Sequence, residues 1–278
     1  MSGIALSVEA LLRWRHPVKG LITPGSFIAL AEETGLIVPM NEWVLREACR
    51  QARAWIDARG PDLRVAVNLS AVQFRRADVL ETVLSALDEA HLDPHFLEIE
   101  LIEGMLMDDP ERAAQVLTLL RARGVSVAID DFGTGYSSLS YLRRLPIDKL
   151  KIDRSFVRDL LVNRTDESIV RAIVSLAHSV GLEVIAEGVE SEQQLERICL
   201  LECDLWQGYY CCPPQPPGCL EALLAARGAA ASREVLIEPP RGSRRAAEPA
   251  RAGGNGASSR LVALDLVDDE GYDPAEHE

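Results

Sequence analysis

Carboxylate and amide side chains recur where short apolar runs of the chain end, and their chemistry is that of a metal site. Five of them offer oxygen as the donor atom: Glu9, Asn68, Glu100, Asp130 and Asp131. An oxygen-rich set without histidine is typical of hard cations such as Mg²⁺ or Mn²⁺ rather than of zinc. Two such cations about 4 Å apart clamp the attacking and leaving oxygens of a phosphoryl displacement. The residue types therefore predict a two-metal site for phosphoryl chemistry.

The alternation of side chains along each run places these groups on one common face. Between Leu97 and Leu101 the apolar residues share one phase, and Glu98 and Glu100 share the other. Across the runs, the polar phase holds Ser7, Glu9, Arg13, Asn68, Glu98, Glu100, Asp130, Lys149, Lys151, Asp153, Glu187 and Gln207. In a closed parallel barrel this phase faces the lumen, and reactive groups gather at the C-terminal ends of the strands.

Each of these residues also has an ordinary structural interpretation. Asn68 could simply end a strand, Asp131 could cap the following helix, and Glu187 and Glu190 could be solvated turn residues. Lys151 could neutralise a metal-bound hydroxide or a phosphate oxygen, whereas a Schiff-base role needs a neutral amine, which many carboxylates disfavour. The agreement of seven runs favours one shared site over separate structural roles.

The elements that must position these residues alternate between strand-like and helix-like segments. Strands are predicted at 4–14, 63–69, 97–102, 125–129, 147–152, 182–186 and 203–206. Helices are predicted at 41–59, 76–90, 110–123, 167–180 and 191–200. Such alternation is typical of a parallel sheet covered by helices, so the sequence predicts an α/β fold.

Composition excludes several classes of protein. The 278 residues carry 43 acidic and 29 basic side chains, a net charge of −14, which disfavours binding to a nucleic acid polymer. No run is long and apolar enough for a membrane span, and no signal peptide is visible, so a cytoplasmic location is expected. The six cysteines match no zinc-site spacing and are expected to be reduced thiols. After residue 224 the sequence becomes rich in Ala, Gly, Arg and Pro, and a disordered tail is predicted over 225–278.

The motifs together resemble those of the EAL domain, the bacterial cyclic di-GMP phosphodiesterase. Glu9-Ala10-Leu11 is similar to its signature. The motifs that follow in the same order are Asn68-Leu69-Ser70, Glu100-Leu101-Ile102-Glu103, Asp130-Asp131-Phe132-Gly133, Lys151-Ile152-Asp153, Glu187-Gly188-Val189-Glu190 and Gln207-Gly208-Tyr209. The resemblance extends from about Ile4 to Pro217 and implies a TIM-like (β/α)8 barrel that hydrolyses cyclic di-GMP to linear pGpG with Mg²⁺ or Mn²⁺.

The resemblance also implies a role for each residue. One metal would be held by Glu9, Asn68, Glu100 and Asp130, and a second by Asp131 with Asp130 shared. Lys151 and Gln207 would position the nucleophilic water, and Glu187 would act as general base or orient that water. Arg13 and Asp153 would bind substrate, while Glu103 and Glu190 would brace the loop after Asp131. Family members commonly act as homodimers, and a sensory or regulatory protein partner is also expected.

Two departures from the family pattern bear on these expectations. Ile102 stands where the family has a threonine, which removes a hydroxyl but no carboxylate. The chain starts only eight residues before Glu9, so the EAL-type barrel, assigned to residues 1–224, is expected to lack its first strand. A gap of this kind keeps open an alternative function, a non-catalytic cyclic di-GMP receptor or protein-interaction module with an incomplete barrel.

Overall fold

Within the described part of the chain, eight parallel strands close into a barrel and follow one another in chain order. The computed structural model describes residues 6–59, 63–76, 78–106, 108–134, 144–219 and 259–266. The barrel strands are β1 (Leu6–Leu12), β4 (Leu63–Asn68), β5 (Leu97–Ile102), β6 (Ser126–Phe132), β7 (Lys149–Ile152), β8 (Glu183–Ala186), β9 (Leu205–Gln207) and β10 (Ser259–Leu266). The seven strands predicted from the sequence are therefore confirmed, with ends that differ by a few residues.

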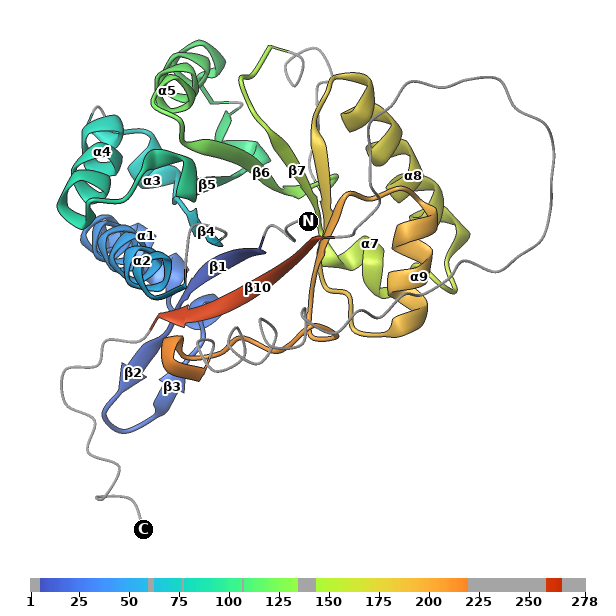
Figure 1. The fold of residues 1–278 in the computed structure, drawn as a ribbon, viewed down its shortest axis with the longest axis horizontal. Helices are drawn as coiled ribbons and strands as arrows, with labels where there is room; N and C mark the ends of the chain where they lie inside the picture. Colours follow the sequence, from blue (N-terminus) through green and yellow to red (C-terminus); the bar gives the residue numbers. More distant parts are fainter. Residues whose placement is uncertain are drawn as a thin grey trace.

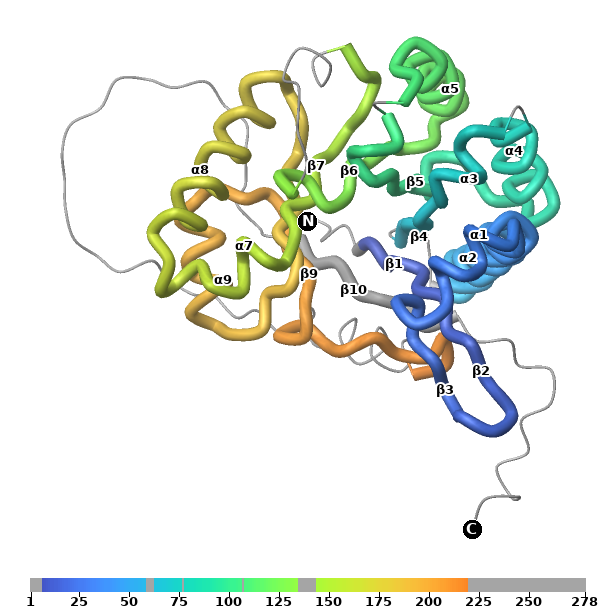
Figure 2. Tube along the Cα trace, turned by 180° about the vertical axis from the view of Figure 1, so that it is seen from behind, coloured from blue at the N-terminus to red at the C-terminus, as the bar shows by residue number. Residues whose placement is uncertain are grey.

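Helices cover the outside of this barrel (Figure 1). They are α1 (Ile28–Thr34), α2 (Ile37–Arg59), α3 (Ala71–Phe74), α4 (Val79–Ala90), α5 (Pro110–Ala122), α7 (Arg154–Arg158), α8 (Arg164–Ser179) and α9 (Glu192–Leu200). Short 3₁₀ turns are η1 (Pro24–Ser26), η2 (Pro94–Phe96) and η3 (Glu103–Leu106). A separate antiparallel hairpin, β2 (Trp14–His16) with β3 (Gly20–Ile22), projects from the barrel and is also seen from behind in Figure 2.

Local sequence explains where the helices begin. The side chain of Asp109 accepts a hydrogen bond from the backbone N–H of Arg112 at the start of α5. Ser191 and Gln194 form a reciprocal capping box at the start of α9. These caps satisfy backbone donors that have no partner within the helix. Helix α5 begins at the predicted residue and α9 within one residue of its predicted start.

The apolar phase of each strand packs against the helices and forms the core. Val65, Val67, Ile99 and Leu101 are fully buried, as is Leu150 on β7. The opposite phase of the same strands is polar and also buried, because it faces the barrel interior. The fold therefore buries two layers, one apolar and one charged, on the two faces of a single sheet.

Strand β10 corrects the expectation of an incomplete barrel with a disordered tail. Ser259–Leu266 lies between β1 and β9, where it pairs Val8 with Val262 and Gln207 with Leu261. Without it, both neighbouring strands would present unpaired backbone groups along an edge, and the aliphatic stretch 261–264 supplies a strand that satisfies them. The rest of the predicted tail, and the predicted boundary at residue 224, lie outside the described residues.

Among the described residues, none of the helices is long and apolar enough to cross a membrane.

Candidate metal and active site

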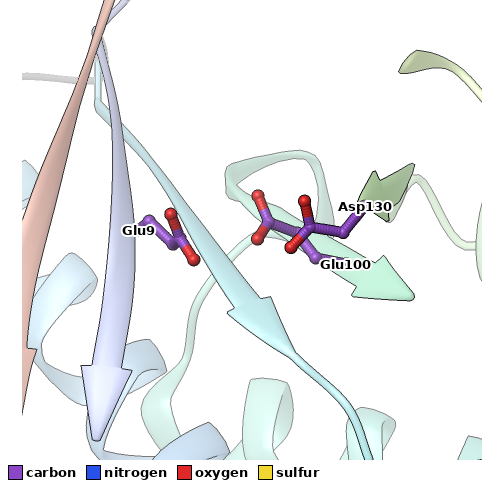
Figure 3. Close-up of side chains that lie close together, drawn as sticks. All are labelled: Glu9, Glu100 and Asp130. Atoms are coloured by element: carbon purple, nitrogen blue, oxygen red, sulfur yellow. The ribbon is translucent and has the colours of Figure 1, made fainter. Parts of the chain in front are cut away.

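Three buried carboxylates come together inside the barrel from three different strands. Glu9 on β1, Glu100 on β5 and Asp130 on β6 each offer a carboxylate oxygen within 4.8 Å of the other two. Figure 3 shows the side chains of Glu100 and Asp130 next to each other, with Glu9 pointing toward them. Asn68, at the end of β4, donates from its Nδ2 to Glu9 Oε1 at 2.7 Å. All four members of the predicted first metal site therefore lie together.

Lys151 is the positive centre of this cluster. Its side chain is fully buried on β7, and its Nζ lies 2.7 Å from both Glu100 Oε2 and Glu187 Oε1. The same nitrogen lies 3.3 Å from Asp130 Oδ1 and 3.7 Å from Glu9 Oε2. One ammonium therefore faces four carboxylates, and the cluster keeps an excess of negative charge that a divalent cation would neutralise.

The protonation of these groups follows from burial and mutual charge. Burial and the charge of Glu9 raise the pKa of Glu100 well above its usual value. Burial opposes ionisation of Glu9 too, but the charge of Lys151 and hydrogen bonds from Gln207 and Asn68 lower its pKa overall. Burial alone would lower the pKa of Lys151, and the surrounding carboxylates raise it well above the usual value, so the amine stays charged. That charge is incompatible with a Schiff base.

A second carboxylate group forms around Asp131 at the end of β6. Asp131 has a backbone φ of +55°, and the pairing of β6 with β7 shifts register between Ile129 and Phe132. This irregularity breaks the alternation of the strand, so Asp130, Asp131 and Glu187 offer oxygens within 4.8 Å of one another. The backbone N–H of Asp131 donates to Asp130 Oδ1 at 2.9 Å. Asp130 and Asp131, between which the resemblance implies a shared metal, therefore lie at one site.

Glu187 and Asp131 both bind protons more tightly than a free carboxylate does. Burial raises the pKa of Glu187 to about 8. The charge of Lys151 lowers this pKa, and the charges of Asp130 and Glu9 raise it. Burial, followed by the charges of Asp130 and Asp153, raises the pKa of Asp131 to about 6. Asp153 also caps α7 by accepting from the backbone N–H of Ser155 at 3.0 Å. Its place beside Asp131 puts this predicted substrate-binding residue at the edge of the site.

Gln207 enters the site from β9 and contacts Glu9 directly. Its Nε2 donates to Glu9 Oε2, and its own backbone carbonyl accepts from the N–H of Val189 at 3.0 Å. The next residue, Gly208, has φ of +155°, and a Cβ there would lie 2.2 Å from the carbonyl oxygen of Val189. Only glycine fits at this approach, which explains why glycine follows the glutamine.

Two unpartnered oxygen atoms show that the donor set suits a cation. Glu100 Oε1 and Gln207 Oε1 are buried, and neither has a hydrogen-bond partner among the described residues. A buried acceptor without a donor is costly unless another group satisfies it. Together with the three converging carboxylates, these atoms fit a hard divalent cation held entirely by oxygen.

Three other predicted site residues lie outside the central cluster. Arg13 follows β1, is half-buried, and donates from Nη1 to the carbonyl oxygen of Leu12 at 2.9 Å. Glu103 begins η3 and is buried, and its Oε2 has no partner in the described part of the chain. Glu190 is exposed before α9. The loop that Glu103 and Glu190 are predicted to brace includes residues 135–143, which lie outside the described residues.

Family comparison decides what kind of domain carries this cluster. The EAL domain model matches residues 2–214. The chain belongs to the EAL domain family. The predicted resemblance and the expected barrel fold are both confirmed.

Curated relatives of this EAL domain are longer proteins. The chain is 49% identical over 225 residues to the bifunctional diguanylate cyclase/cyclic di-GMP phosphodiesterase MucR of Pseudomonas aeruginosa, covering 81% of this chain and 32% of MucR. It is 48% identical over 219 residues to the cyclic di-GMP phosphodiesterase NbdA of the same organism, covering 79% and 28%. The chain thus spans about a third of the length of these curated relatives.

Solved structures share the barrel of this EAL domain. The PaMucR phosphodiesterase in complex with c-di-GMP is 52% identical, with a TM-score of 0.69 over 70% of this chain and 79% of that one. The EAL enzyme Bd1971, solved with cAMP and cyclic di-GMP bound, is 32% identical, with a TM-score of 0.74 over 78% of this chain and 60% of that one.

One buried contact in this EAL domain was not predicted from the sequence. Lys149 Nζ lies 2.6 Å from Glu98 Oε2, and both side chains are buried below the central cluster. The alternation of polar residues on β5 and β7 indicates that both face the lumen. It does not indicate which acid each lysine contacts, because that depends on the stagger between strands.

Proposed function

We propose that this EAL domain is a metal-dependent phosphodiesterase that hydrolyses one 3′–5′ phosphodiester of cyclic di-GMP to linear pGpG. The relatives named as cyclic di-GMP phosphodiesterases support the substrate, as does the c-di-GMP complex of PaMucR. The observation that carries the proposal is the excess of carboxylates around Lys151. A buried site of net negative charge can accept a phosphodiester only when cations accompany it.

The proposed metal site uses the residues that the barrel brings together. Glu9, Asn68, Glu100 and Asp130 would hold one Mg²⁺ or Mn²⁺, and Asp131 would hold a second with Asp130 shared. Such cations, when bound, lower the pKa of a coordinated water and neutralise charge on the phosphate. The unpartnered oxygen of Glu100 supports this assignment.

The remaining residues of the cluster orient groups and handle protons. Lys151 fixes the carboxylates of Glu100 and Glu187 through its two shortest contacts. Glu187 has a pKa raised to about 8, so both of its protonation states are accessible near neutral pH, as a group that accepts a proton from water requires. Gln207 holds the carboxylate of Glu9, and we assign substrate contacts to Arg13 and Asp153.

The decisive experiment is an assay with chromatographic separation of the nucleotides. The full chain is incubated with cyclic di-GMP and Mg²⁺ or Mn²⁺, with EDTA, and as the Glu9→Ala variant. Glu183→Ala is the matched control, because Glu183 is an exposed carboxylate at the start of β8. We expect pGpG from wild type and the control, and none with EDTA or Glu9→Ala. Product formation in EDTA would overturn the metal-dependent assignment.

A binding titration separates the enzyme from the receptor alternative. Tight binding of cyclic di-GMP without product, in the presence of either cation, would favour a non-catalytic receptor. Absence of both binding and product would favour a protein-interaction role. The complete set of converging carboxylates supports the enzyme, because a receptor has no need for a two-cation site.

The assembly of the chain is a further part of the proposal. We propose a homodimer and a sensory or regulatory protein partner, on the basis of the family resemblance and of the much greater length of the curated relatives. Light scattering of the purified chain checks the dimer, and a single monomeric species at assay concentration would contradict it.

A further inference from the structure

Below the catalytic cluster, the barrel holds a second lysine-carboxylate pair that the proposed mechanism does not use. Lys149 Nζ lies 2.6 Å from Glu98 Oε2, and the side chains are 5% and 0% exposed. Ser126 Oγ donates to the same oxygen at 3.0 Å. Lys149 and Ser126 also line a cavity of about 450 Å³ at the N-terminal end of the barrel, which places the pair between that cavity and the cluster above.

The strand register places Lys149 in the same cross-strand row as Glu100, a residue of the proposed metal site. Its ion-pair partner Glu98 lies two residues earlier on the strand of Glu100. Glu100 pairs with Ala128, and Ala128 pairs with Lys149 on the other side. Adjacent strands are about 4.8 Å apart, so the Cα atoms of Glu100 and Lys149 are separated by about 10 Å. Only the methyl group of Ala128 stands between them in this row. A flexible lysine ammonium and a glutamate carboxylate can meet across such a gap.

The ammonium of Lys149 nevertheless bonds one step lower, to Glu98. Both donors to Glu98 converge on Oε2, and Oε1 has no hydrogen-bond partner in the described part of the chain. The buried charge of Glu98 therefore depends on Lys149, and the charge of Lys149 depends on Glu98. Removal of Glu98 alone leaves the Lys149 ammonium without a counter-charge and within reach of Glu100.

We propose that Glu98 is a positioning residue that keeps the Lys149 ammonium below the carboxylate cluster, so that Lys151 alone enters it. The inference rests on the proposed function, because its consequence is the availability of Glu100 as a metal ligand. When glutamine replaces Glu98, Lys149 turns to Glu100 and competes with the cation. Removal of Lys149 as well eliminates the competitor and restores the site.

The test is a mutant cycle read by Mn²⁺ binding. Electron paramagnetic resonance of free Mn²⁺ gives the affinity of wild type, Glu98→Gln, Lys149→Met and the double variant. We expect Glu98→Gln to weaken Mn²⁺ binding about 10-fold or more, which is the scale seen for groups that orient metal ligands. Lys149→Met and the double variant are expected to stay within roughly threefold of wild type. Lys19→Met removes the same chemical group from an exposed position and serves as the matched control.

The outcomes separate this inference from the proposed function. Equal loss of Mn²⁺ affinity in Glu98→Gln and the double variant would overturn the inference, as would an unchanged affinity in Glu98→Gln. Mn²⁺ binding that follows the expected cycle without any hydrolysis would instead overturn the proposed function alone. A thermal melt monitors folding, and if Glu98→Gln does not fold, Glu98→Asp with and without Lys149→Met gives the same comparison.

Discussion

The two ends of the barrel interior use the same kind of side chains for different purposes. At the N-terminal end one lysine, Lys149, faces one carboxylate, Glu98, and the charges balance. Two residues further along β5 and β7, Lys151 faces Glu100. Lys151 also faces Glu9, Asp130 and Glu187 from other strands, and the charges do not balance. A balanced buried pair needs no further ligand, whereas an excess of carboxylates is stable only with protons or cations. The imbalance, rather than the presence of ionic groups, distinguishes the candidate site from the structural layer.

The largest test of this comparison exchanges each lysine for methionine. Lys151→Met leaves four buried carboxylates without a counter-charge, and loss of such contacts costs about 3–5 kcal/mol of unfolding free energy without divalent cations. We expect hydrolysis to fall by at least about 100-fold, a loss of about 2.7 kcal/mol in transition-state stabilisation. Lys149→Met is the control for hydrolysis, which nucleotide assays measure in both variants, and denaturant melts measure the unfolding free energy. Equal loss of hydrolysis in the two variants would remove the distinction between the two ends.

Deletion of residues 259–278 tests whether both ends depend on closure of the barrel. Strand β10 separates β1, which carries Glu9, from β9, which carries Gln207. Its loss exposes two strand edges, and we expect the melting temperature to fall by about 5–10 °C. Deletion of residues 267–278 alone keeps β10 and is the control. An unchanged melt after the longer deletion would show that β10 contributes nothing to the barrel.

Cation binding is expected to stabilise the domain through the residues at the C-terminal end of the barrel interior alone. Mg²⁺ or Mn²⁺ at about 100 times its dissociation constant should raise the unfolding free energy by about 2.7 kcal/mol, because it binds the folded state alone. Thermal melts with and without EDTA measure the shift. Glu9→Gln should abolish this shift. Glu98→Gln should reduce the shift to the extent that the substitution weakens cation binding. The same shift in Glu9→Gln as in wild type would place the cation elsewhere.

The smallest expected effect concerns Ser126 in the N-terminal layer. Ser126→Ala removes one hydrogen bond to Glu98 and keeps the ion pair, so we expect a loss of about 1 kcal/mol in unfolding free energy. Hydrolysis and Mn²⁺ affinity should stay at wild-type values. A substantial loss of either would show that the lower layer takes part in the reaction more directly than a positioning role allows.

Periodicity in the sequence predicted most of the barrel but not its closing strand. Strand β5 has the predicted ends, because apolar and acidic residues alternate strictly from Leu97 to Leu101. Strand β6 runs on to Phe132, three residues beyond the predicted end, since the register shift carries the strand past Asp130. Strand β10 was missed because it is flanked by low-complexity sequence and its partners, β1 and β9, lie far away in the chain. Pairing of this kind has no local signal.

The sequence by itself determined the donor chemistry of the candidate site, because residue type and two-residue alternation fix which groups face the lumen. Glu9, Asn68, Glu100, Asp130 and Lys151 follow from that rule. Only the tertiary structure decided the partners. In the folded barrel Lys151 contacts Glu100 and Lys149 contacts Glu98, and Asp131, at a positive φ, offers a carboxylate oxygen near Glu187. Distances between side chains on different strands depend on strand register and on barrel closure. Contacts between segments far apart in the sequence set both, and local periodicity carries no information about them.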